Sequence, residues 1–139
     1  MSKSINQIQD EIIEEFAMFD DWMEKYEYII ELGKELEGFP EQERKEENII
    51  SGCQSKVWLT AEKRENGLIH FHADSDAIIT KGMVSLMLRI FNDQLGSEIV
   101  AADMNFLTTI GLLENLSQTR SNGLAAMIKQ IKTYGFLLQ

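Results

Sequence analysis

The chain has 139 residues, of which 44% are hydrophobic and 26% charged, and its formal net charge is −10. These values are typical of a globular domain with its own hydrophobic core and argue against a disordered chain. A surface this acidic repels phosphate backbones, so we expect no nucleic-acid partner. We also expect no membrane partner and a cytoplasmic location, because no apolar stretch is long enough to span a bilayer and the first residues lack a secretion signal.

Two amphipathic helices are predicted in the first part of the chain. Ser4 to Gln7 have the form of a capping box, and apolar residues follow them at helical spacing. A second helix is expected to begin near Asp20 or Asp21 and to end near Gly33. The charged stretch from Glu41 to Glu47 is interpreted as a solvated connection.

A β-hairpin is predicted where the spacing of apolar residues changes to two. Residues 65–67, with the sequence Glu-Asn-Gly, mark its turn. A two-residue turn would place Phe71 opposite Glu62, whereas a three-residue turn with a left-handed Gly67 places Phe71 opposite Ala61. We predict the three-residue turn because it pairs apolar residues with each other.

The register of the hairpin also predicts which residues lie opposite one another at its end. Asp74 and Ser75 are expected level with Trp58 and Val57, and Asp76 is expected to cap the helix that follows.

The segments on either side of this region are also expected to be ordered. Ile49 and Ile50 are expected to form a short strand that leads into the turn at Cys53, next to the start of the helix after Asp76. The rest of the chain is predicted helical, including residues 101–108 and a last helix after Arg120.

Cys53 is the only cysteine, so no disulfide can form within the chain. A lone cysteine is usually a small, inert, buried residue. Its neighbours Ser51, Gly52, Gln54 and Ser55 are small or polar, which is typical of a turn and favours a reactive thiol.

The chemistry open to this thiol is limited by its surroundings in the sequence. His70 and His72 share one strand face without a third ligand, so we interpret them as part of a half-exposed face and expect no metal site. No base is evidently dedicated to Cys53. Thiol exchange suits such a thiol, because the attacked sulfur is already activated and the partner leaves as a thiolate.

The combination of motifs resembles the SufE family of sulfur-acceptor proteins. The residues that carry the resemblance are Gly52-Cys53-Gln54-Ser55, Val57-Trp58-Leu59, Asp74-Ser75-Asp76-Ala77, Lys81-Gly82 and, further on, Arg120 with Asn122-Gly123-Leu124.

The resemblance implies an α+β fold, with a small antiparallel sheet packed by helices as in IscU-type scaffolds, in one domain over residues 1–139. It implies a sulfur carrier for iron–sulfur cluster assembly and not an enzyme. Cys53 would accept sulfur as a persulfide from a cysteine desulfurase of the SufS or CsdA type and accelerate that enzyme. It would then deliver the sulfur to a scaffold complex of the SufBCD type. Pyridoxal phosphate would belong to the desulfurase, and no cofactor of the carrier itself is implied.

The resemblance also implies roles for residues around Cys53. Arg120 would either stabilise the thiolate or persulfide or pair with a carboxylate. The other positions would shape the loop or contact the partner, namely Gly52, Gln54, Ser55, Asp74 and Asp76. The alternatives are a redox-sensing or peroxide-reactive thiol, a cysteine hydrolase, and a binding module with an inert cysteine.

Overall fold

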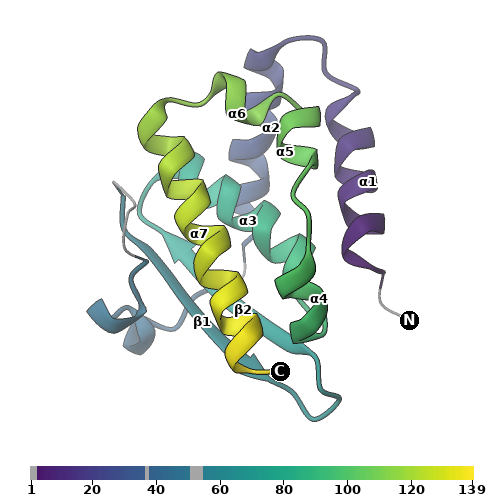
Figure 1. Ribbon diagram of the computed structural model, residues 1–139. Helices are drawn as coiled ribbons and strands as arrows, with labels where there is room; N and C mark the ends of the chain where they lie inside the picture. Colours follow the sequence, from purple (N-terminus) through teal and green to yellow (C-terminus); the bar gives the residue numbers. More distant parts are fainter. Residues whose placement is uncertain (1–2, 37, 51–54) are drawn as a thin grey trace.

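The computed structural model describes residues 3–36, 38–50 and 55–139. Within them the chain forms an α+β fold with one antiparallel hairpin, as predicted (Figure 1). The central helix α3 packs against α1, α2, α7 and strand β2, while α7 crosses in front of the hairpin in Figure 1. The elements, in order, are α1 (Ile5–Phe16), α2 (Trp22–Lys34), the 3-10 helices η1 (Glu41–Glu43) and η2 (Glu46–Asn48), β1 (Val57–Lys63), β2 (Ile69–Ser75), α3 (Ile78–Phe91), α4 (Gly96–Ala101), α5 (Phe106–Thr109), α6 (Leu112–Asn115) and α7 (Gln118–Leu137).

Both N-terminal helices begin where the sequence predicts. The Ser4 hydroxyl accepts a hydrogen bond from the Gln7 amide at 3.1 Å, and the Gln7 side chain accepts one from the Ser4 amide at 2.9 Å. Asp21 caps α2 by accepting from the amide of Glu24 at 2.9 Å. The capping box and the start of α2 are therefore confirmed, because each depends on contacts only three residues apart.

The hairpin has the predicted register. Ala61 lies opposite Phe71, and Trp58 lies opposite Asp74. The turn spans three residues, with Gly67 at a φ of 85° and its amide donating to the Arg64 carbonyl at 2.9 Å. This left-handed conformation favours glycine, as the prediction requires.

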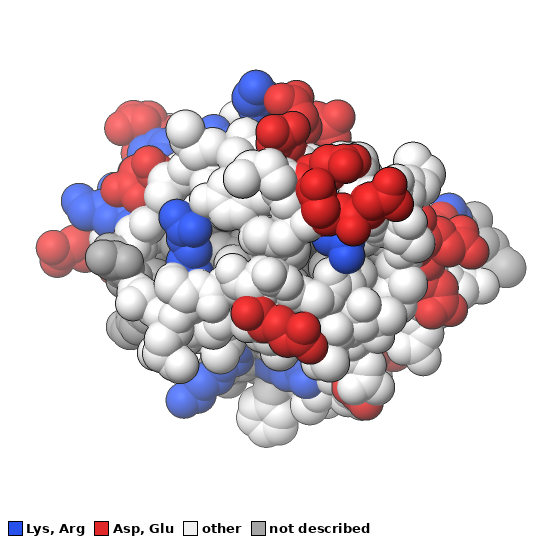
Figure 2. Space-filling model, turned by 90° about the horizontal axis from the view of Figure 1, so that it is seen from above, with Lys and Arg blue, Asp and Glu red and all other residues white. Residues whose placement is uncertain are grey.

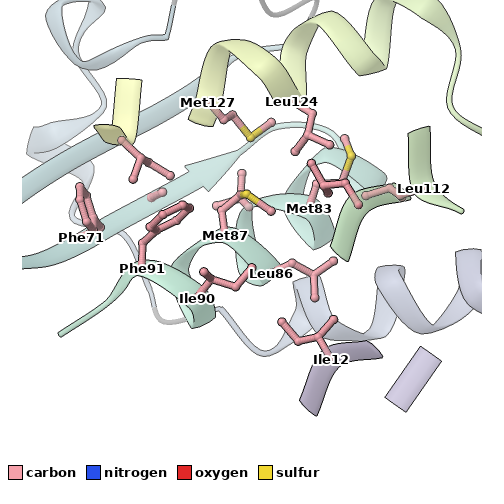
Figure 3. Packing of buried hydrophobic residues seen from close by; sticks show 14 of the residues in the cluster. Ile12, Phe71, Met83, Leu86, Met87, Ile90, Phe91, Leu112, Leu124 and Met127 are labelled. Atoms are coloured by element: carbon pink, nitrogen blue, oxygen red, sulfur yellow. The ribbon is translucent and has the colours of Figure 1, made fainter. Parts of the chain in front are cut away.

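The core gathers around α3 (Figure 3). Met83, Leu86 and Ile90 are almost fully buried there. They lie between Ile12 of α1 and the α7 residues Leu124 and Met127 (Figure 3). Helices α2 and α3 approach very closely at Gly82, where a Cβ would lie only 2.1 Å from the Ile29 carbonyl oxygen. This contact sets the position of α3 relative to the N-terminal helices.

The C-terminal half differs from the prediction in two places. Residues 102–105 are not helical, because the Ala102 carbonyl accepts from Lys132 at 2.6 Å and the Asp103 carbonyl accepts from Gln9 at 2.9 Å. Arg120 does not precede the last helix but lies in its first turn, because Ser117 caps α7. Both differences arise from contacts that the apolar pattern does not contain.

Candidate functional site

The predicted reactive residue Cys53 lies outside the described residues, as do Gly52 and Gln54. The structure does define the chain on both sides of them. On the incoming side, Ile49 forms a single antiparallel bridge with Trp58, and the Ile50 amide donates to the Val57 carbonyl at 2.9 Å. The expected short strand is thus reduced to one bridge.

The outgoing side, at Ser55 and Lys56, is fixed to the end of β2. The Lys56 amide donates to the Asp76 carboxylate at 3.1 Å, and the Lys56 carbonyl accepts from the Ser75 hydroxyl at 2.9 Å. Both sides of the segment that carries Cys53 are therefore attached to the same end of the hairpin, next to the start of α3. The expected proximity of the Cys53 turn itself concerns residues outside the described ranges and stays a prediction.

Asp76 does not cap α3, which corrects the prediction. Strand β2 continues to Ser75, and the N-cap position of α3 is Ala77, which has no side-chain cap. The Asp76 carboxylate is instead directed to Lys56. The Ser75 hydroxyl accepts from the Ala77 amide at 3.2 Å, so a serine that also holds Lys56 supports the turn into the helix.

Asp74 is a buried carboxylate with several partners. Its side chain is only 9% exposed and lies 2.5 Å from the Arg44 guanidinium and 3.4 Å from the Lys81 ammonium. One of its oxygens also accepts from the Ser75 amide at 2.8 Å. Burial by itself would raise the pKa of Asp74, but the hydrogen bonds from Arg44 and Ser75 and the charge of Lys81 outweigh it and lower that pKa.

Arg44 is the site residue that sequence reasoning missed. It belongs to the stretch interpreted as a solvated connection, yet its guanidinium carbon lies 4.9 Å from the centre of the Trp58 ring and 5.5 Å from that of Phe39. Its Nε also pairs with Glu41 at 3.1 Å. Four acidic residues near it in the sequence make this stretch resemble a solvated loop. The one signal for its role is Asp74 at the hairpin end, because a buried carboxylate requires a cation as partner.

Arg120 is exposed and contacts an aromatic residue. Its guanidinium donates to the Tyr26 hydroxyl at 3.0 Å, and among the described residues no carboxylate pairs with it. A cavity of about 90 Å³ separates the first turns of α3 and α7. The residues that line it include Ser55, Ala77, Thr80, Met83, Arg120 and Met127. Arg120 and Ser55 are thus brought together, whereas Asp74 and Asp76 lie beside the hairpin end.

The two histidines interact with carboxylates. His70 Nδ1 lies 3.2 Å from Asp93 and His72 Nε2 lies 3.6 Å from Glu62, with the two rings 4.9 Å apart. Within the described part of the chain, no group of three or more residues is suited to hold a metal ion.

The charge on the surface is unevenly spread. The face shown in Figure 2 is largely uncharged in its centre, with both acidic and basic side chains around it. In the ranges that the structure describes, no helix combines the length and the apolar character needed to cross a bilayer.

Comparison with known proteins assigns the chain to a family. The profile described as "SufE: Fe-S metabolism associated domain" matches residues 10–135. An uncharacterized SufE-like protein of Rhizobium etli is 45% identical over 127 residues, which cover 88% of this chain and 86% of that protein. Another, from Rhizobium meliloti, is 44% identical over 128 residues, covering 89% and 91%.

A solved structure supports the fold. The solution structure of a hypothetical protein from Thermus thermophilus matches with a TM-score of 0.76 at 16% identity, over 94% of this chain and 95% of that one. At that identity the match concerns the fold alone, and it agrees with the α+β architecture. The sequence relatives and the profile together show that the chain belongs to the SufE family, which is associated with iron–sulfur metabolism.

Proposed function

We propose that the protein accepts and carries sulfur for iron–sulfur cluster assembly in the cytoplasm. Cys53 takes sulfur from a cysteine desulfurase, accelerates that enzyme and passes the sulfur to a cluster scaffold complex. The observation that carries the proposal is a family match over residues 10–135 in a chain with a single thiol. The anchoring of both sides of the Cys53 segment to one hairpin end supports it, because a carrier must present its thiol in a defined place.

The proposed step is a thiol exchange without net oxidation. The Cys53 thiolate attacks the terminal sulfur of a persulfide on the desulfurase cysteine. A new S–S bond forms on Cys53 while the S–S bond on the desulfurase breaks, and the electron pair leaves with the desulfurase cysteine as a thiolate. The proton that Cys53 gives up is matched by the proton that the leaving thiolate takes up. Pyridoxal phosphate acts in the desulfurase, where it releases sulfur from free cysteine.

Intact-mass spectrometry tests the proposal. The protein is mixed with a cysteine desulfurase of the SufS or CsdA type, pyridoxal phosphate and cysteine. The expected result is a gain of one sulfur atom, roughly 32 Da, on the wild type and none on the Cys53→Ser variant. No gain beside a desulfurase that is demonstrably active would refute the sulfur-carrier function and leave a redox-reactive thiol as the better interpretation.

A further inference from the structure

We propose that Arg44 is a positioning residue for Cys53, because it fixes the incoming side of the thiol segment to the end of the hairpin. This inference rests on the proposed function and adds a residue to it. Arg44 lies nine positions before Cys53 in the sequence. It contacts Asp74, which lies thirty positions after Arg44. It therefore joins the connection after α2 to the strand that also holds the outgoing side.

The guanidinium of Arg44 lies near two aromatic rings and contacts a carboxylate. The rings of Trp58 and Phe39 lie 4.9 and 5.5 Å from it, and Nη2 contacts the buried Asp74 carboxylate at 2.5 Å. Only arginine combines a flat cation that stacks on aromatic rings with several donors in one plane. The side chain is 26% exposed, so these contacts are partly shielded from water.

The fixed position of Arg44 extends to Ile50 through short local contacts. The Asn48 side chain donates to the Glu43 carbonyl at 2.8 Å, and the Ile49 amide donates to the Glu46 carbonyl at 3.0 Å. The Ile50 amide then joins β1, three residues before Cys53. The connection from Arg44 to Ile50 is therefore held by hydrogen bonds and is not a loose linker.

The bonds that hold Lys56 on the outgoing side do not involve Arg44 itself, although Arg44 contacts Asp74 beside them. Lys56 is held by Asp76 and Ser75 through bonds to its own amide and carbonyl. Loss of Arg44 is therefore expected to loosen the incoming side more than the outgoing side. This asymmetry separates positioning from a general loss of stability.

The test uses Arg44→Met, which keeps an apolar stem and removes the cation. We expect sulfur transfer from the desulfurase to Cys53 to slow about tenfold, as a misplaced reactive group does. In the same variant, hydrogen exchange should speed up more at the Ile50 amide than at the Lys56 amide. The matched control is Arg64→Met, which removes an exposed arginine from the hairpin turn and should leave transfer and both amides as in the wild type.

A double variant distinguishes positioning from stability. Arg44→Met leaves the Asp74 carboxylate buried with one partner fewer, which destabilises the fold. Adding Asp74→Asn removes that buried charge, so thermal stability should rise toward the wild type while transfer stays slower than in Asp74→Asn alone, which shows the effect of losing Asp74 itself. Recovery of transfer together with stability would show that Arg44 matters only for folding and would overturn the inference.

The inference can fail separately from the proposed function. If wild-type protein gains no sulfur, the proposed function fails, and exchange at Ile50 still decides whether Arg44 fixes this side of the segment. If wild-type protein gains sulfur and Arg44→Met gains it at the same rate, the positioning role is refuted and the function stands. Unchanged exchange at Ile50 would refute the role in either case.

Discussion

Replacing Gly82 by alanine tests the close contact that places α3, the helix beside the site. The added Cβ would lie 2.1 Å from the Ile29 carbonyl oxygen and 2.5 Å from Ile29 Cγ2, where ordinary contacts begin at 3.4 Å. Since the nearest atom is backbone, α2 and α3 must move apart. Such overpacking costs about 3 kcal/mol, and the better helix propensity of alanine returns about 1 kcal/mol. The net loss is about 2 kcal/mol, which for 139 residues corresponds to a melting temperature lower by about 7 °C.

Thermal unfolding followed by circular dichroism measures this loss. Gly38→Ala is the matched control, because a Cβ there meets nothing within 4 Å. It should melt close to the wild type. If Gly82→Ala also melted within about 2 °C of the wild type, the close packing of α2 on α3 would not limit stability and the reasoning would be wrong.

Three further predictions concern stability. The pKa of Glu15 is lowered, chiefly by the hydrogen bond from Arg89. The stability that Glu15 contributes is therefore present at pH values above its ordinary pKa of 4.5, and it is lost as the pH falls through its pKa in the folded state. Urea unfolding should therefore show wild type above Glu15→Gln near neutral pH, with the difference shrinking near pH 3; a difference that grew in acid would reverse the sign of this argument. Ser117→Ala removes the hydroxyl oxygen that accepts from the Arg120 amide and caps α7, and it should cost about 1 kcal/mol in the same assay, whereas Ser117→Asp should retain most of the stability. Gly67→Ala should cost about 1 kcal/mol because of its φ of 85°, although space is open around it, and Gly67→Asn should cost less.

The sequence predicts well the features that depend on neighbouring residues. The hairpin register follows from the spacing between the turn glycine and the apolar residues on each strand, and a shift by one residue would expose Phe71. The starts of α1 and α2 follow from side chains that bond three residues ahead. In each case the signal and the structure lie in the same few residues.

Contacts between distant residues are what the sequence did not predict. Arg44 and Asp74 are thirty positions apart, and the stretch around Arg44 has the composition of a solvated loop. Asp76 has the residue type and position of a helix cap, but β2 extends to Ser75 and the Asp76 carboxylate accepts from the Lys56 amide instead. The break at residues 102–105 likewise follows from Gln9 and Lys132, which reach carbonyls from other helices.

The ion pairs of Asp74 also bear on the proposed chemistry, because they offset the charge of one carboxylate at the hairpin end. From the sequence alone, a carboxylate at the hairpin end would oppose formation of a thiolate nearby. In the fold, Asp74 pairs with Arg44 and Lys81, and Arg44 pairs in turn with Glu41. Two cations and two carboxylates make this cluster formally neutral, so Asp74 adds little net negative potential around it. An acidic protein can thus keep a buried carboxylate at this end of the hairpin while nearby cations offset its charge.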